Sequence, residues 1–487
     1  MHRPLILIAT LMAAFAAPQA QARKLGTLEF KPCSLSAPLS GEALPAQCTT
    51  LAVPENPAAP AGRKIKLKIA WIPADNADAA EPDPVMMLAG GPGQSALESY
   101  PQAAGAFAET RKKRHIVLVD QRGTGSSNPL TCKAPQDESA FASADSARRY
   151  TQACLDALAK RADPRFYTTT EAIQDLEAVR KAIGAEQLNL VGISYGTRVA
   201  QQYAVRYPQS TRTLVLDSVA PNTLVLGNEF ARNLEDALDL QFARCARIPE
   251  CVQRLGDPRA RLKALLARLA TDPPRVDYRD AVTGERKQDR LTPELVTGLV
   301  RMYAYLPIAS ALLPLQLNEA ANGRYDALMA LSQMLNTQLS DSIAMGMQLS
   351  VICAEDGGEL KPNPADEGSL LGNDFANILS AQCAIWPKGA RPANFRAPLK
   401  TAVPALLLSG EFDPVTPPRY GDEVAKSLPN GRHMVLRGQG HNVIGVGCMP
   451  RLMARFIDAA DAKPLDAKCL DRLPYTPPFT GFYGWEP

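Results

Sequence analysis

The sequence predicts an α/β fold, in which a mostly parallel sheet is flanked by helices and interrupted by a large helical insertion. Two features of the 487-residue chain support this prediction. Short apolar runs alternate with helical patterns in the first part of the chain and again near its end, as expected of strands joined by crossover helices. Between these parts helical patterns dominate. The late strands need a sheet to join, so we expect one interrupted core rather than separate domains in series.

Seven apolar runs have the length and residue types of buried strands. They are residues 67–72, 85–89, 115–119, 188–193, 213–216, 405–408 and 433–436. The helical spacing of apolar residues predicts further elements. These helices cover residues 171–183, 195–207, 230–245, 259–270, 294–311 and 451–460. We therefore expect a core at residues 23–220 and 398–487, with a helical cap inserted at residues 221–397.

The composition argues against several classes of protein. Hydrophobic residues make up 46% of the chain and charged residues 21%, which is typical of a globular protein and not of a disordered one. The net charge is +3, and the one short basic run, at residues 111–114, is interpreted as a solvated turn, so we expect no nucleic-acid partner.

The N-terminus has the form of a secretory signal peptide at residues 1–22. Arg3 precedes an apolar stretch from Leu5 to Ala17, and Ala20 and Ala22 supply the small residues of a cleavage site. A membrane anchor is the alternative, but the stretch is shorter than the roughly 18–20 residues that a span needs. We expect cleavage after Ala22, a periplasmic or secreted product and no stable membrane association. The oligomeric state is not indicated.

Ten cysteines follow the expected leader, and an even number in an exported chain indicates disulfides. Sequence does not fix connectivity, but the cysteines fall into five pairs of close neighbours, which we predict as bridges. The pairs are Cys33–Cys48, Cys132–Cys154, Cys245–Cys251, Cys353–Cys383 and Cys448–Cys469. No Cys-x-x-Cys pair and no Cys/His cluster with ligand spacing occurs, so we expect neither a metal nor another cofactor.

Ser194 is the candidate nucleophile. It lies in a Gly-x-Ser-x-Gly pattern between a predicted strand and a predicted helix. Such a pattern forms a sharp turn that exposes the serine hydroxyl, and the flanking glycines remove Cβ atoms that would clash there. The following helix adds a dipole that favours developing negative charge.

A serine needs a base to remove its proton, and the chain has few histidines. His441 lies in a glycine-containing loop before the last helix, whereas His115 and His433 open strands and suit structural roles. Asp413, in a loop that follows the strand at residues 405–408, is the candidate carboxylate, and Glu411 is its near rival. The order serine, acid, histidine is that of the α/β-hydrolase fold.

The oxyanion of such a reaction needs two backbone amide donors. Tyr195 follows the candidate nucleophile and supplies one amide. The loop of residues 89–95 is rich in glycine, and we expect Gly91 to supply the other. A phosphate-binding loop is excluded because no Gly-Lys-Ser/Thr follows.

Three motifs resemble the prolyl and tripeptidyl aminopeptidase family of serine α/β-hydrolases. They are Gly-Gly-Pro-Gly at residues 90–93, Asp-Gln-Arg-Gly-Thr-Gly-Ser at residues 120–126, and Gly-Ile-Ser-Tyr-Gly at residues 192–196. The segments Gly-Glu-Phe-Asp-Pro and Gly-Gln-Gly-His resemble the C-terminal region of the secreted tripeptidyl branch. Ala89 stands where the prolyl branch usually has histidine, which favours the tripeptidyl branch.

The resemblance implies an exopeptidase that acts on free N-termini, with peptides as substrates. Such an enzyme needs a carboxylate for the substrate ammonium, because an unpaired buried charge is costly. Glu355 and Asp356 are the candidates, and a solvated acidic turn is the alternative interpretation. Arg122 is expected to organise the loop beside the oxyanion site. A carboxylesterase or lipase with the same residues, or a noncatalytic binding protein on this fold, stays open.

Overall fold

A computed structural model of the chain describes residues 22–37, 43–132 and 143–485. Apart from Ala22, the leader predicted from the sequence lies outside these residues. No helix among the described residues is long and apolar enough to cross a membrane.

One ten-stranded sheet, counted over the described residues, runs in the order β1-β2-β3-β4-β6-β5-β7-β8-β11-β12. The strands are β1 Arg23–Leu25, β2 Leu28–Ser36, β3 Ala43–Pro54, β4 Lys64–Ile72, β5 Val85–Leu88, β6 Ile116–Val119, β7 Leu188–Ile193, β8 Thr211–Asp217, β11 Ala405–Gly410 and β12 Gly431–Leu436. From β6 to β12 neighbouring strands are parallel. The predicted α/β fold with a mostly parallel sheet is therefore confirmed.

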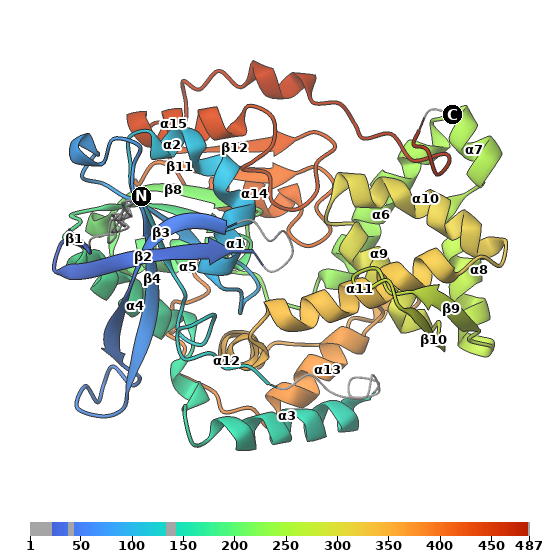
Figure 1. Cartoon of the computed structure of the whole chain (residues 1–487), viewed down its shortest axis with the longest axis horizontal. Coiled ribbons are helices and arrows are strands. Elements are labelled where there is room, and N and C mark those ends of the chain that lie inside the picture. The colour runs from blue at the N-terminus through green and yellow to red at the C-terminus, as the bar shows by residue number, and fades with distance from the viewer. Residues whose placement is uncertain (1–21, 38–42, 133–142, 486–487) are drawn as a thin grey trace, which may run out of the picture.

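Helices cover both faces of this sheet (Figure 1). The helices outside the insertion are α1 Ala96–Ala103, α2 Ala108–Arg111, α3 Ala144–Leu158, α4 Thr169–Ala182, α5 Tyr195–Arg206, α14 Pro418–Ala425 and α15 Met449–Ala459. Residues of α1 and α15 share one buried cluster, and residues of α4, α5 and α14 share the other. Leu190 and Val191 of β7 belong to different clusters, because successive side chains of a strand point to opposite faces.

The segment between β8 and β11 divides into two parts. Its elements are α6 Phe230–Ala246, α7 Pro249–Leu255, α8 Pro258–Thr271, β9 Arg275–Arg279, β10 Arg286–Arg290, α9 Pro293–Tyr303, α10 Pro307–Ala321, α11 Asp326–Ser342, α12 Met345–Glu355 and α13 Asp374–Cys383. Residues of α6, α8, α9, α10 and α11 form a core of their own. In contrast, α12 and α13 contribute to a cluster of the sheet and lie beside α3 (Figure 1).

The structure corrects one predicted helix and adds strands. The helix predicted over residues 294–311 is wrong, because α9 ends at Tyr303 and α10 begins at Pro307. Leu306 between them is extended, as the residue before a proline prefers. The sheet also begins with four antiparallel strands, of which only the last was predicted. The hairpin β9–β10 was missed because β10 is entirely exposed and carries no apolar pattern.

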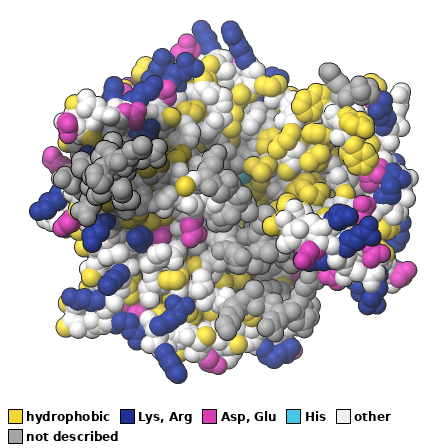
Figure 2. Space-filling view, viewed as in Figure 1, with side chains coloured by type: hydrophobic (Ala, Val, Ile, Leu, Met, Phe, Trp, Pro, Cys, Tyr) yellow, Lys and Arg dark blue, Asp and Glu magenta, His cyan; other side chains and the backbone are white. Residues whose placement is uncertain are grey.

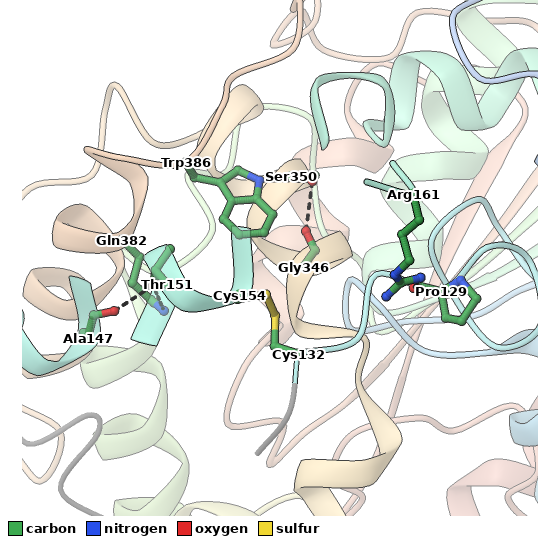
Figure 3. Close-up of a disulfide and its surroundings, with 10 residues drawn as sticks. All are labelled: Pro129, Cys132, Ala147, Thr151, Cys154, Arg161, Gly346, Ser350, Gln382 and Trp386. Carbon is green, nitrogen blue, oxygen red and sulfur yellow. Dashed lines mark hydrogen bonds between the residues drawn. A yellow bond between two sulfur atoms is a disulfide. The ribbon is translucent and has the colours of Figure 1, made fainter. Parts of the chain in front are cut away.

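All ten cysteines form disulfides, in the five pairs that sequence order predicts. Figure 3 shows Cys132–Cys154, which ties the chain after Pro129 to α3. Close to this disulfide, Gln382 Nε2 of α13 donates to Thr151 Oγ1 of α3 at 3.1 Å. Helices α3 and α13 are thereby held together beside the sheet.

Candidate active site

Ser194 lies at the turn between β7 and α5, with φ of 55° and ψ of −122°. This strained conformation is maintained by close packing on both sides. A Cβ on Gly192 would lie 2.4 Å from the Gly196 carbonyl oxygen, and one on Gly196 would lie 2.1 Å from the Leu88 oxygen. Only glycine fits either position, which explains the Gly-x-Ser-x-Gly pattern physically. Ser194 itself stays half-buried and reachable from solvent.

The glycine loop that follows β5 packs directly against this turn. A Cβ built on Gly90 would lie 3.1 Å from Ser194 Cβ. Gly91 has a φ of +105°, which side-chain-bearing residues rarely adopt. The Tyr195 amide opens α5, where the first amides have no acceptor within the helix. The two amides predicted from the sequence thus belong to segments that meet at Ser194.

Asp413 and His441 form a buried pair at the ends of β11 and β12. His441 Nδ1 lies 2.8 Å from Asp413 Oδ2, and the two residues are 6% and 2% exposed. The Asp413 carboxylate also accepts from the amides of Val415 and Thr416 at 2.9 and 2.8 Å. The Thr416 hydroxyl adds a third bond at 2.9 Å. With these partners the carboxylate holds the imidazole in one orientation.

The electrostatics of the pair suit a general base. Burial is the largest single influence and disfavours both charges, but the mutual attraction and the hydrogen bonds together outweigh it. The pKa of His441 is therefore raised and that of Asp413 lowered from their ordinary values. A carboxylate that remains charged stabilises the imidazolium that forms when the base takes a proton.

Glu411, the rival acid, is directed elsewhere. It accepts from the Gly438 amide at 2.7 Å and from the Tyr475 hydroxyl at 3.2 Å. The other two described histidines also have structural partners. His115 Nδ1 accepts from the Ala74 amide at 3.0 Å. His433 lies between Ser409 and Asp422.

Asp217, which sequence reasoning missed, joins the nucleophile turn to the histidine loop. Its carbonyl oxygen accepts from the Ser194 amide at 2.9 Å. Its carboxylate accepts from the Val443 amide at 2.9 and 3.0 Å and from the Ile444 amide at 3.1 Å. Ser194 and His441 are thus brought to one edge of the sheet by one residue at the end of β8. Burial raises the pKa of Asp217 to about 6, although both amides oppose the shift.

The Asp-Gln-Arg-Gly motif braces the glycine loop without entering the site. Asp120 accepts from Ser95 Oγ at 2.6 Å and from the Ser126 amide at 3.0 Å. Arg122 is fully buried and makes a bidentate pair with Asp175, with both distances 2.7 Å. Asp120 thus bonds Ser95 of the glycine loop, whereas Arg122 anchors its own loop to α4, and its predicted role beside the oxyanion site stays a prediction.

The two carboxylates predicted to bind the substrate ammonium are both buried. Asp356 already pairs with Arg198 at 3.0 Å and with Arg396 at 2.7 Å. Glu355 Oε1 accepts from the Thr169 amide at 2.8 Å, and its Oε2 has no hydrogen-bond partner among the described residues. Burial raises the pKa of Glu355 to about 7, although Arg198 opposes the shift. The two side chains are therefore not equivalent. The charge of Asp356 is balanced by two guanidinium groups, whereas one carboxylate oxygen of Glu355 has no hydrogen bond among the described residues.

Over the described ranges, no group of three or more His, Cys, Asp or Glu side chains is placed to hold a metal ion. The residues gathered at the sheet edge are those of acyl transfer: a serine, an imidazole paired with a carboxylate, and backbone amides.

Comparisons with known proteins bear on the fold and the enzyme class. A family model described as alpha/beta hydrolase fold matches residues 83–300, and one described as TAP-like protein matches residues 368–469. The chain is 27% identical to serine protease Hip1 of Mycobacterium tuberculosis (strain ATCC 25618 / H37Rv) over 92% of each chain. It is 30% identical to a tripeptidyl aminopeptidase of Streptomyces lividans over 36% of this chain and 35% of that one. It is 26% identical to carboxylesterase B of M. tuberculosis (strain CDC 1551 / Oshkosh), over 87% and 86%.

The fold and these relatives define a serine hydrolase of the α/β-hydrolase fold. Within that class, residues 368–469 match the model described as TAP-like protein, and the enzyme class of the chain is serine peptidase.

Proposed function

We propose that the chain is an exported serine exopeptidase that releases short peptides from free N-termini through an acyl-enzyme on Ser194. The observation that carries the proposal is the contact of Asp217 with both halves of the site. It bonds the Ser194 amide on one side and the loop after His441 on the other. Asp217 thereby fixes the backbones that carry the proposed nucleophile and base relative to each other, as orientation of reacting groups requires.

In the proposed mechanism, His441 removes the proton from Ser194 Oγ, which attacks the scissile carbonyl carbon. The amides of Gly91 and Tyr195 stabilise the oxyanion, each by about 3–4 kcal/mol of barrier. His441 then protonates the leaving amine, which departs as the shortened peptide. A water molecule attacks the acyl-enzyme by the same route and releases the N-terminal fragment.

Glu355 is the better of the two candidates for binding the substrate ammonium. Asp356 is held by two guanidinium groups, whereas Glu355 Oε2 is 3.9 Å from Arg198 and lacks a hydrogen bond among the described residues. Glu355 is 1% exposed, so an ammonium group reaches it only if neighbouring side chains move. In this role its replacement by Gln lowers the preference for free over acetylated N-termini, and kcat for accepted substrates changes little.

The deciding experiment compares a free-amine tripeptide p-nitroanilide with its N-acetylated twin. The purified, oxidised chain should cleave only the free form, and Ser194→Ala should fold normally but lose turnover. Cleavage of both forms would remove the free-amine requirement. Normal activity of Ser194→Ala would remove the proposed nucleophile.

A carboxylesterase is the second candidate, because one relative with that name is 26% identical over most of the chain. An esterase would use the same serine, base and oxyanion amides. Hydrolysis of simple aryl esters without any cleavage of the peptide amides would favour it.

Export is part of the proposal. The form of residues 1–22 and the five disulfides support it, since disulfides persist in oxidising compartments. The intact mass of protein recovered outside the cytoplasm should correspond to a chain that begins at Arg23. Full-length protein retained inside the cell would contradict export.

A further inference from the structure

The turn between α9 and α10 touches the candidate base directly. The Tyr305 carbonyl oxygen accepts from the His441 amide at 2.9 Å, and the two rings meet edge to face with centroids 5.1 Å apart. A Cβ on Gly440 would lie 2.1 Å from the same oxygen, so the contact is close. The residues that follow Tyr305 therefore lie at the rim of the site, on the side of His441.

These residues present apolar side chains to solvent. Leu306 is 54% exposed and Ile308 is 51% exposed. Two exposed aliphatic residues within three positions, next to a candidate base, suggest a surface that is covered when a ligand binds.

The apolar surface continues along α10 to the C-terminal segment. The Phe479 amide donates to the Ala311 carbonyl oxygen at 2.9 Å, and the rings of Phe479 and Trp485 are 5.5 Å apart. Phe482 and Trp485 are 70% and 43% exposed. Figure 2 shows hydrophobic side chains gathered over α10 and the C-terminal segment. We call Leu306, Ile308, Phe482 and Trp485 the apolar strip.

We propose that the apolar strip binds the leaving portion of the peptide, so that substrates with apolar residues directly after the scissile bond are preferred. This inference rests on the proposed function. In that reaction His441 gives its proton to the leaving nitrogen, so the chain beyond that nitrogen starts beside His441. Tyr305, at the start of this turn, contacts the His441 loop, so a leaving segment that starts there passes over the residues that follow Tyr305.

The apolar character of the strip determines which side chains it binds. Burying an aliphatic side chain against Leu306 and Ile308 removes apolar surface from water, whereas a polar side chain there loses hydration without a partner. A membrane surface or a second copy of the chain would also cover apolar groups. Neither explains why the strip begins at the turn that carries the contact with His441.

The test uses two free-amine peptides of equal length that differ only after the bond that the wild-type chain cuts. One carries two leucines there and the other two glutamines. Wild-type protein should cleave the leucine peptide with a kcat/KM about tenfold higher, a typical discrimination for an apolar subsite. Leu306→Glu and Ile308→Glu should each reduce this ratio to about twofold or less.

The matched control is Val282→Glu, which places the same charge on a residue 72% exposed in the β9–β10 hairpin. It should keep the tenfold ratio. Hydrolysis of the tripeptide p-nitroanilide, which has no residue after the bond, reports the state of the catalytic residues in each variant. Because the readout is a ratio between two peptides, a variant that folds poorly still gives a valid value.

Equal kcat/KM for the two peptides with wild-type protein would overturn the inference, as would a tenfold ratio that survives in both variants. A dimer or vesicle-bound form that Leu306→Glu disrupts, with equal turnover of both peptides, would assign the strip to that other occupant. Failure of the proposed function is a different result: neither peptide nor the p-nitroanilide is cleaved, while simple esters are hydrolysed through Ser194.

Discussion

At the scale of single residues, two carboxylates hold His441 and the backbone that follows it. Asp413 bonds the imidazole ring, and Asp217 bonds the backbone that follows the histidine. The first sets the charge and tautomer of the ring, and the second sets its position relative to Ser194. Each contribution has its own dependence on pH, so the two are separable by experiment.

Asp413→Asn should lower kcat/KM by roughly 10³–10⁴-fold, because the amide neither fixes the tautomer nor stabilises the imidazolium. The pKa of His441 is raised by Asp413, so the acid limb of the pH–rate profile should move to lower pH in the variant. The profile of kcat/KM against pH measures both effects. Glu411→Gln is the control, since Glu411 bonds Gly438 and Tyr475, and should cost less than about tenfold. A larger loss in Glu411→Gln than in Asp413→Asn would reverse the assignment.

Asp217→Asn should change how stability depends on pH. Burial raises the pKa of Asp217 from 3.8 to about 6, so the folded chain binds this proton more tightly than the unfolded chain. The resulting stabilisation is fully present below about pH 4 and is lost as the pH rises through about 6. Asparagine has no such proton. The thermal midpoint of the variant, relative to wild type, should therefore rise between about pH 4 and 7, by an amount corresponding to roughly 3 kcal/mol. Parallel curves would show that Asp217 does not titrate in this range.

The sequence predicts those site residues whose role depends on their immediate neighbours in the chain. Ser194 is predicted because glycine is required on both sides of a strained turn, and His441 because so few histidines are available. Asp217 follows a predicted strand, at the edge where the other candidates lie, and that position was its only signal. Its bonds to residues more than 200 positions away, which are a property of the fold, are invisible in a local pattern.

At the scale of elements, a buried ion pair joins α5, which carries the nucleophile turn, to α12. Arg198 and Asp356 have side chains that are fully buried and lie 3.0 Å apart. Asp356 also bonds Arg396 at 2.7 Å, which extends the link to the chain after α13. Such a network fixes the relative position of the two helices, and it makes each partner costly to remove.

Asp356→Asn should lower the free energy of unfolding by about 3 kcal/mol, because a buried guanidinium loses its charged partner. Glu359→Gln is the matched control. Glu359 also pairs with Arg396, but its side chain is 44% exposed, so its loss should cost less than about 1 kcal/mol. Thermal midpoints at one scan rate compare the two variants. Equal midpoints would show that the α5–α12 link contributes nothing to stability.

The sequence predicted best the elements whose apolar residues follow one pattern along their whole length. Buried strands such as β7 and β11 are almost wholly apolar and were located within a residue or two. The break between α9 and α10 was missed because the apolar spacing continues across it. Pro307 was the available signal, since the preceding residue is driven out of the helical region.

At the scale of the whole molecule, two separate parts of the insertion reach the site. The α9–α10 turn contacts the loop of His441, and the segment before α12 contacts the glycine loop, where the Ala344 amide donates to the Gly93 oxygen at 3.0 Å. The helical patterns of residues 221–397 predicted one helical cap. The division into a lobe with its own core and a pair of helices packed on the sheet depends on long-range contacts that no local pattern encodes.

The disulfide Cys353–Cys383 should matter for both stability and activity. It joins α12 to α13, and α12 begins next to the residues that contact the glycine loop. The bridge spans 30 residues, so the entropy model assigns it about 4 kcal/mol, against about 2 kcal/mol for Cys245–Cys251, which spans 6.

Replacing both cysteines of each pair by serine gives two matched variants. The α12–α13 variant should show the lower thermal midpoint and a several-fold lower kcat on the p-nitroanilide, because the glycine loop loses a fixed neighbour. The other variant should keep the wild-type kcat, since its disulfide lies between α6 and α7. If both variants turned over substrate as fast as wild type, α12 would have no influence on the oxyanion site.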